Sequence, residues 1–355
     1  MDILLKENVL RRARLLHQQN PVVDAHFDLP GELLLRHKRG ERDIIRRDYL
    51  EKWKRAGLKL LVASVFVPTA ITTRENPEEI LADVLDQIEA LFGEMQGNGQ
   101  LTLIRDRTDL ERVLKTDQIG ILLYLEGLDC IGEELFVLSR LFEKGVRGAA
   151  LTWSRKNALA TGCCKAGEYK QIPGQITEAG RRVIREMERL SMFLDVSHLN
   201  DEGFEQVLTI AKKPFLATHS GSRSVYDNYR NLTDEQMILL SGQGGVMGLN
   251  GCKLIAGSLS GNHLEMLCKH AEYETKLMGA GHVGLGLDFC DAYDRAAAAA
   301  AGKMLTEEMD CLRDHTGLIL LTAALLQRGM AEMDVIAIMG ESMLRYFRAV
   351  LPGGA

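Results

Sequence analysis

The sequence predicts an α/β fold, a (β/α)8 barrel (TIM barrel) with extra helices and a short extra strand. Short apolar runs alternate with segments of helical periodicity along most of the chain. The runs are nearly continuous in Val, Ile, Leu and Ala, as parallel strands are when helices cover both faces of a sheet. An open doubly wound sheet shows the same alternation and is the alternative. The eight predicted strands are Pro21–Asp28, Leu58–Val67, Ile119–Glu126, Val146–Trp153, Met192–His198, Pro214–His219, Gly245–Asn250 and His282–Asp288.

Helices are expected between these runs, where apolar residues recur with the period of an amphipathic helix. Asp201 and Thr233 are predicted N-caps, because Thr233-Asp-Glu-Gln matches a capping box and Asp201 precedes an apolar-periodic segment. The first 20 residues also form an expected amphipathic helix. The other clear predicted helices are Glu133–Lys144, Thr177–Leu190, Asp201–Ala211, Thr233–Leu240, His263–Met278 and Thr306–Gln327.

Two segments depart from a plain alternation of strands and helices. Residues 68–118 are too long for one crossover, so we predict a helix over Pro77–Gln96 and a short extra strand over Leu101–Arg105. A run of six alanines, Ala296–Ala301, is expected to form a helix or a loop and indicates no function. Since no linker or mid-chain shift in composition is visible, residues 1–355 are predicted to form a single domain.

Composition excludes several classes of protein. With 46% hydrophobic and 26% charged residues, the chain has an ordinary globular composition. Its formal net charge of −6 argues against nucleic acid as a partner. No run approaches the ~20 apolar residues of a membrane span, so no membrane partner is expected. Seven cysteines without CxxC spacing, together with an N-terminus unlike a secretory signal, predict free thiols and a cytoplasmic location.

Polar side chains stand where the predicted strands end. His26 and Asp28 lie two residues apart at the end of the first strand, a spacing that places both side chains on one side of a strand. Four further strands end in a histidine or a carboxylate. These residues are Glu126, His198, His219 and Asp288. Because barrel active sites gather at the carboxyl ends of the strands, all six side chains are expected at one mouth.

Imidazole and carboxylate groups in this proportion suit zinc or a similar divalent ion. One catalytic zinc takes about three protein ligands, so five candidates suit two ions that share a carboxylate and a water of lowered pKa. Asp288 is then left to move protons. Each residue alone also has a structural interpretation: Glu126 as a loop carboxylate, Asp288 as a helix cap and His198 as part of a turn. The remaining histidines fall outside the carboxyl ends of the strands and are expected to be structural.

At these positions the sequence resembles the membrane (renal) dipeptidase family, peptidase family M19 of the amidohydrolase superfamily. The resemblance extends over residues 20–350 and rests on seven motifs that keep the family's order. These are VVDAHFDLP, LLYLEG, ALTWSRKNALATG, FLDVSHLNDEGFEQVL, FLATHSGSRSVYDNYRNLTDEQM, GGVMGLN and HVGLGLDF. The resemblance implies a barrel with a two-zinc centre, in which His26 and Asp28 bind one zinc and His198 and His219 the other. Glu126 bridges both, and a hydroxide shared by the ions attacks the amide of a dipeptide.

The resemblance also implies the substrate contacts. Asp288 passes a proton to the leaving amine, and Arg230 binds the terminal carboxylate, which suits the fork of a guanidinium. Trp153 stands where mammalian relatives have a histidine that polarises the scissile carbonyl. Its indole can donate one hydrogen bond but cannot act as a base. Asn250 is followed by Gly251 and Cys252 rather than by an aromatic residue, so the side-chain preference of the pocket stays open.

The expected function is therefore a zinc-dependent dipeptidase acting on small dipeptides, both L,L and L,D. One alternative is a metal-dependent amidohydrolase that acts on N-acyl amino acids or related amides, because the same ligands suit both. A second alternative is a non-catalytic barrel, for which erosion of the ligands would be expected, and none of the five is eroded. A homodimer is expected, as for many enzymes and for this family.

Overall fold

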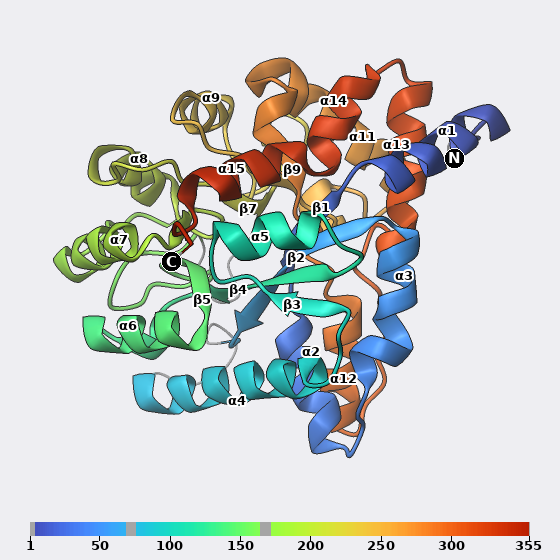
Figure 1. Ribbon diagram of the computed structural model, residues 1–355. Helices are drawn as coiled ribbons and strands as arrows, with labels where there is room; N and C mark the ends of the chain where they lie inside the picture. Colours follow the sequence, from blue (N-terminus) through green and yellow to red (C-terminus); the bar gives the residue numbers. More distant parts are fainter. Residues whose placement is uncertain (1–3, 69–75, 164–171, 355) are drawn as a thin grey trace.

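The strands form a closed parallel barrel. The computed structural model describes residues 4–68, 76–163 and 172–354. Eight parallel strands are ordered β6-β5-β4-β2-β1-β9-β8-β7 (Figure 1), and a parallel bridge between Asp195 and Leu216 joins the two ends of that row. The predicted (β/α)8 barrel is confirmed. The strands are β1 (Val22–Phe27), β2 (Leu58–Phe66), β4 (Ile119–Glu126), β5 (Val146–Ala150), β6 (Phe193–Asp195), β7 (Ala217–Ser220), β8 (Met247–Leu249) and β9 (Val283–Leu285).

The predicted insertion after β2 is also present. Helix α4 (Pro77–Met95) begins at Asn76, whose side chain accepts a hydrogen bond from the Glu78 amide. The short strand β3 (Leu101–Leu103) follows and pairs in parallel with the first residues of β4. This pairing leaves the later residues of β4 to pair with β5, so the extra strand does not disturb the carboxyl end of the barrel.

Alternating side chains divide the apolar core into two layers. Along β2, Leu60 and Val62 belong to the cluster that fills the barrel, while Leu61 and Ala63 belong to the layer between strands and helices. The last helix, α15 (Ser342–Val350), adds Phe347 to the inner cluster, where its ring packs 5.4 Å from the ring of Phe193. The amino end of the barrel is thus filled with apolar side chains, and polar groups gather at the other end.

Helices surround the barrel (Figure 1). The N-terminal helix α1 (Glu7–Gln19) packs against α13 (Leu318–Gln327), and the alanine run continues α12 (Asp291–Ala300) as far as Ala300. The other helices of the described residues are α2 (Leu29–Lys38), α3 (Leu50–Arg55), α5 (Arg107–Leu114), α6 (Leu135–Lys144), α7 (Glu178–Leu190), α8 (Asp201–Ile210), α9 (Asp234–Gly242), α10 (Lys253–Ala256), α11 (His263–Met278) and α14 (Glu332–Ile336).

Two expectations about helices are corrected. The predicted helix Thr306–Gln327 is wrong in its first half, because Asp310 bonds to backbone amides at 290 and 291 and α13 begins only at Leu318. The N-cap of α8 is Asn200, whose side chain accepts from the Gly203 amide; the predicted cap, Asp201, instead pairs with Arg223. The capping box at Thr233 is confirmed.

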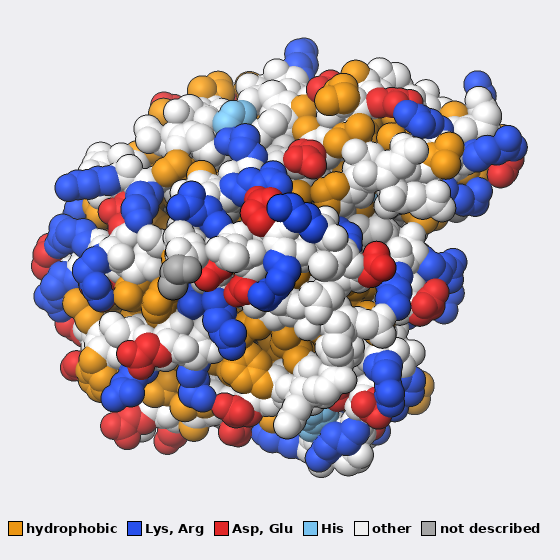
Figure 2. Space-filling model, in the orientation of Figure 1, with side chains coloured by type: hydrophobic (Ala, Val, Ile, Leu, Met, Phe, Trp, Pro, Cys, Tyr) orange, Lys and Arg blue, Asp and Glu red, His pale blue; other side chains and the backbone are white. Residues whose placement is uncertain are grey.

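The surface agrees with the modest net charge. On the face shown in Figure 2, positive and negative side chains are interspersed. Among the described residues, no helix combines the length and apolarity needed to cross a bilayer. Cys130, Cys252, Cys268, Cys290 and Cys311 are free thiols, as expected, and Cys164 lies outside the described residues.

Candidate metal centre

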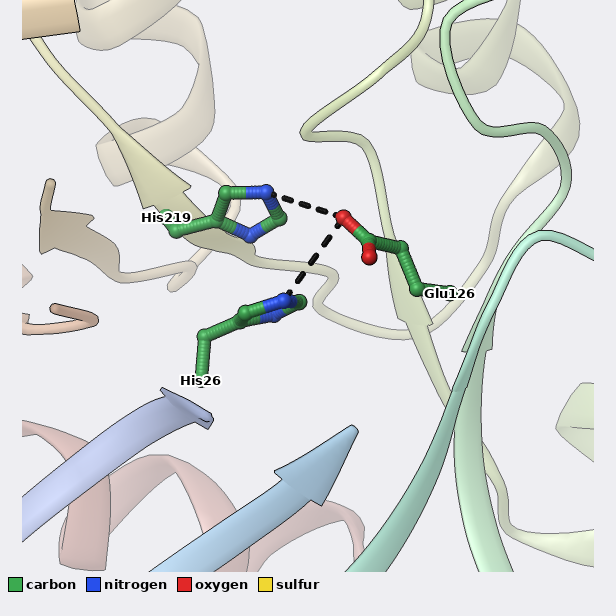
Figure 3. Close-up of side chains that lie close together, drawn as sticks. All are labelled: His26, Glu126 and His219. Carbon is green, nitrogen blue, oxygen red and sulfur yellow. Dashed lines mark ion pairs between the residues drawn. The ribbon is translucent and has the colours of Figure 1, made fainter. Parts of the chain in front are cut away.

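A carboxylate and three imidazoles meet at the carboxyl end of the barrel. Glu126 is the last residue of β4, and one of its oxygens, Oε1, lies 3.2 Å from His219 Nε2 and 3.6 Å from His26 Nε2 (Figure 3). The same oxygen lies 2.7 Å from His198 Nε2. The four side chains come from β1, β4, β7 and the loop after β6, so barrel closure brings them together.

Two aspartates approach the same cluster from the side of His26. The Nε2 atom of His26 lies 3.5 Å from Asp28 Oδ1 and 3.9 Å from Asp288 Oδ1. Asp288 has a left-handed backbone (φ 52°), a conformation rare for a residue with a side chain. Its amide donates to the His26 carbonyl, and Asn250 Nδ2 donates to its Oδ2 at 3.0 Å. Both interactions hold the carboxylate over the cluster.

Several of these residues lie beyond the strands rather than at their last position. The predicted strand ends at Trp153, His198 and Asp288 are corrected to Ala150, Asp195 and Leu285. Asp28 is likewise the first residue after β1. The left-handed turn at Asp288 shows the physical reason, because no strand residue adopts that conformation. The loops turn these side chains inward over the end of the barrel.

A buried network beneath the cluster orients two of the imidazoles. Thr218 Oγ1 donates to Asp195 Oδ2 at 2.5 Å, and it lies 2.8 Å from His219 Nδ1 and 3.3 Å from His26 Nδ1. Because its one hydrogen goes to Asp195, the hydroxyl accepts from both Nδ1–H groups. The Nε2 lone pairs of His26 and His219 therefore face Glu126.

Sequence reasoning does not single out Thr218 or Asp195. A charged residue inside the apolar run Phe193–Val196 is the signal that could have found Asp195, because an unpaired buried carboxylate is costly. The third imidazole has its own partner, since Ser154 Oγ lies 3.1 Å from His198 Nδ1. All three histidines are thus oriented by neutral hydroxyl groups.

The cluster fits a divalent cation. His26 Nε2 and Asp28 Oδ1 are buried and have no hydrogen-bond partner among the described residues, which is unfavourable unless they have another function. Nitrogen and oxygen ligands of one tetrahedral zinc lie about 3.3–3.6 Å apart, as follows from metal–ligand distances of about 2.0–2.2 Å. The contacts of His26 with Glu126 and Asp28, at 3.6 and 3.5 Å, match this spacing. The residues expected as ligands therefore have the chemistry and the separations of a metal site.

Burial and charge act differently on the members of the cluster. Burial, with help from Asp28 and Asp288, raises the pKa of Glu126 to about 7. Burial alone would lower the pKa of His26. The charge of Glu126 and contacts with Asp28 outweigh this and raise the pKa of His26 well above its usual value. Burial lowers the pKa of His198 and of His219 well below theirs, and the guanidinium of Arg230 lowers both further. His198 and His219 are thus neutral imidazoles, the form that binds metals.

A small cavity opens onto the cluster. Its volume is about 260 Å³, and its wall includes Glu126, Trp153, Arg230 and Asp288. The sequence alone does not show that Arg230 is buried, yet only 6% of it is exposed. Its guanidinium donates to the carbonyls of Ser197 and His219, each at 3.3 Å. No carboxylate within the described ranges forms an ion pair with Arg230, so its charge is free to meet a ligand.

Trp153 forms part of the same wall. Its ring packs edge-on against Phe66, with centroids 4.8 Å apart, and lies 6.0 Å from the ring of His198. The structure thus brings together every residue expected in the site: the five candidate ligands, Asp288, Arg230 and Trp153. The six other histidines, which the sequence predicts to be structural, contribute none of these contacts; His315, for example, bonds to the buried Asp24 in β1.

Comparison with known proteins places the chain in a family. Residues 10–351 match the sequence model of the membrane dipeptidase family (peptidase family M19). Rat Dipeptidase 3 is 28% identical over 98% of this chain and 68% of the rat protein. A dipeptidase structure of family M19 is 25% identical with a TM-score of 0.78, covering 94% of this chain and 99% of that one.

A further structure shares the fold. It is a metallopeptidase from Rhodobacter sphaeroides, bound to a phosphinate mimic of L-Ala-D-Ala, with a TM-score of 0.77 and 24% identity. The match covers 93% of this chain and 99% of the chain of the Rhodobacter sphaeroides protein. The resemblance inferred from the motifs is confirmed. The chain belongs to the membrane dipeptidase family, peptidase family M19, and is an enzyme of the dipeptidase type.

Proposed function

We propose that the protein is a two-zinc dipeptidase that hydrolyses small L,L and L,D dipeptides with a free terminal carboxylate. One observation carries the proposal: a single oxygen of Glu126 lies within 3.6 Å of three imidazoles, beside a buried arginine that forms no ion pair with a carboxylate of the described residues. His26 and Asp28 would hold one ion, His198 and His219 the other, and Glu126 both. When bound, the ions polarise the scissile carbonyl and bring the pKa of a water toward neutrality.

Arg230 sets the position of the substrate. A guanidinium binds a carboxylate through two parallel hydrogen bonds, and the buried position of Arg230 excludes water from that contact. Arg230 and Glu126 line the same cavity, so a dipeptide whose terminal carboxylate binds Arg230 would place its amide bond within that cavity beside Glu126. The cavity of about 260 Å³ is below the range of about 300–1,000 Å³ typical of drug-sized ligands, which favours a substrate as small as a dipeptide.

Asp288 moves the proton. Asn250 occupies its Oδ2, and its Oδ1 faces the cluster at 3.9 Å from His26 Nε2. Burial raises the pKa of Asp288 to about 6, so the group exchanges protons near neutral pH. Asp288 Oδ1 takes a proton from the attacking water and returns it to the leaving amine. Trp153 closes one wall, and its indole N–H is a donor for the carbonyl oxygen of the substrate.

The test uses the purified protein, freed of metal and reconstituted with zinc. L-Ala-L-Ala and L-Ala-D-Ala are compared with their N-acetyl analogues, and metal is counted on the same sample. We expect two zinc ions per chain and cleavage of the free dipeptides. Asp288→Asn keeps the metal and lowers kcat by about 10²–10⁴-fold. Asp294→Asn, in the wall of the same cavity, is the matched control and keeps most of the activity. Faster cleavage of the N-acetyl compounds would instead indicate an N-acyl amino acid amidohydrolase.

A further inference from the structure

A second group of side chains that could bind a metal lies beside the cavity of the candidate site, and its two cysteines line that cavity. Cys290 Sγ is 3.6 Å from Asp310 Oδ1, and ligand atoms of Cys290, Asp291 and Asp310 all lie within 4.8 Å of one another. Cys252 interacts with Cys290 through its thiol. We refer to these four residues as the thiol–carboxylate cluster. It has no member in common with the two-zinc site.

The backbone holds the cluster rigidly. Asp310 accepts hydrogen bonds from the amides of Cys290 and Asp291, at 2.9 and 3.3 Å. Asp291 in turn accepts from the amides of Met309 and Asp310, at 2.5 and 3.3 Å. An antiparallel bridge also joins Cys252 to Asp310. The segments before α10, before α12 and at Asp310 are therefore fixed relative to one another, so the side chains keep their separations without a ligand.

The cluster brings acidic groups together without a matching cation among the described residues. Asp291 is 5% exposed, and in the part of the chain that the structure describes neither Asp291 nor Asp310 forms an ion pair. Burial first, and then the charge of Asp291, raise the pKa of Asp310 to about 8. The neighbouring Cys252 and burial raise the pKa of the Cys290 thiol. Raised pKa values are typical of acidic groups that lie close together in a buried place. A bound divalent cation would stabilise the deprotonated form of these groups.

The separations suit a tetrahedral ion with mixed sulfur and oxygen ligands. Zinc lies about 2.3 Å from a thiolate sulfur and about 2.0–2.2 Å from a carboxylate oxygen, so the two ligand atoms are about 3.5–3.7 Å apart. The observed distance from Cys290 Sγ to Asp310 Oδ1 is 3.6 Å. Two thiols also select soft metals over Mg²⁺ and Ca²⁺.

We propose that the thiol–carboxylate cluster binds a third, thiophilic divalent cation such as Zn²⁺ through Cys252, Cys290 and Asp310. On binding, each thiol loses its proton to solvent and forms a sulfur–metal bond, and Asp310 releases its proton to solvent and binds through a carboxylate oxygen, with no change of oxidation state. Cys252 and Cys290 line the same cavity as Asp288 and Arg230. A cation held there occupies substrate space and attracts the Asp288 carboxylate, so it inhibits. The inhibition rests on the proposed dipeptidase function, whereas the binding does not.

Cobalt is the probe that separates the two sites. The two-zinc site offers only nitrogen and oxygen ligands, so a thiolate-to-cobalt charge-transfer band in the near ultraviolet reports the thiol–carboxylate cluster alone. The metal-free, reduced protein is titrated with Co²⁺. We expect a band that saturates with one equivalent per chain beyond the two bound at the other site. Cys252→Ser and Cys290→Ser are expected to lose it, and Cys268→Ser, a buried thiol in α11, is expected to keep it.

Inhibition is measured on the same variants. Excess Zn²⁺ is expected to lower the dipeptidase rate of the unaltered protein at least about tenfold, relative to its rate with two equivalents, while Cys252→Ser resists. The absence of a band at three equivalents, or a band that persists in folded Cys252→Ser, would overturn the site. A band without inhibition would overturn only the inhibitory role. A band in a protein that cleaves no dipeptide would support the site and contradict the proposed function.

Discussion

The two sides of Glu126 differ in charge. On one side, the acidic half consists of His26, Asp28 and Asp288, and its imidazole has a raised pKa. On the other side, the imidazole half consists of His198, His219 and Arg230, and its two imidazoles have lowered pKa values. The Nη2 atom of Arg230 lies 3.2 Å from His198 Nε2. The acidic half thus carries negative charge, whereas the imidazoles of the other half are neutral and lie beside the positive charge of Arg230.

Because of this difference in charge, the two proposed metal ions are not expected to be equivalent. Carboxylates attract a divalent cation, and a guanidinium at contact distance repels it. The acidic half is therefore expected to bind the first ion tightly, and the imidazole half the second ion more weakly. The second site is weaker because the charge of Arg230 lies beside it. Arg230 is also the group proposed to bind the substrate carboxylate.

The largest effects are expected from removing one ligand in each half. Asp28→Asn should lose the tight ion and His198→Gln the weak one, and each should lower kcat/KM by at least about 10³-fold, because either loss breaks the pair of ions. Metal analysis and zinc titration distinguish the two variants. Asp28→Asn is expected to bind its remaining ion more weakly than His198→Gln does. Equal affinities would show that the halves do not differ.

Removing the positive charge of Arg230 tests the difference between the two halves directly. Arg230→Met is expected to lower kcat/KM for a dipeptide by about 10²-fold, in line with the loss of a buried ion pair. The same variant should bind the second zinc more tightly than the unaltered protein. Arg223→Met is the matched control, since that arginine pairs with Asp201 outside the site. Weaker binding of the second ion by Arg230→Met would contradict the assigned repulsion.

Removing the Thr218 hydroxyl, which contacts an imidazole of each half, is expected to have a smaller effect on zinc binding. Thr218→Val keeps the shape of the side chain but leaves Nδ1 of His26 and His219 without an acceptor, so zinc affinity is expected to fall by about 10–100-fold at both sites. Thr218→Ser retains the hydroxyl and should restore most of the affinity. Competition with a coloured chelator measures both constants. Equal losses in the Val and Ser variants would assign the effect to packing instead.

The smallest expected effect is a pH dependence of the metal-free protein. His26 and Glu126, the latter with a pKa of about 7, hold protons that the unfolded chain has already released. The free energy of unfolding should therefore fall as pH rises from 6.5 through 7. His198 and His219 act in the opposite direction, but only below 6.5, where the unfolded histidines become charged.

Thermal melts of the metal-free protein between pH 6.5 and pH 8 measure this effect. Zinc binds the deprotonated groups, so the rise in Tm on adding zinc should be larger at pH 8 than at pH 6.5. In Glu126→Gln the fall in stability of the metal-free protein should be reduced. A metal-free protein that becomes more stable over this range would contradict the protonated acidic half.

The barrel and the polar residues at its mouth could be predicted because they follow from local patterns. Apolar runs predict the strands, and a histidine or carboxylate directly after such a run indicates a candidate site residue. The strands end before Trp153, His198 and Asp288, which the sequence predicts to be their last residues. Where the backbone leaves the sheet depends on tertiary contacts such as the hydrogen bond from the Asp288 amide to the His26 carbonyl.

Features that depend on contacts distant in the sequence could not be predicted. The role of Thr218 requires knowing that Asp195, 23 residues away, accepts its hydrogen. The burial of Arg230 follows from the path of a loop, and only the family resemblance pointed to that residue. The thiol–carboxylate cluster joins residues 252, 290 and 310, which come from three separate segments. No local spacing connects them.

The two-zinc centre is tested most directly by a calorimetric zinc titration of the metal-free protein, with L-Ala-D-Ala and L-Ala-L-Ala cleavage measured at each point. We expect a tight first zinc, a weaker second zinc, and dipeptide cleavage that rises only as the second ion binds. Full activity with one zinc per chain, or no binding to a folded metal-free protein, would contradict the two-zinc centre.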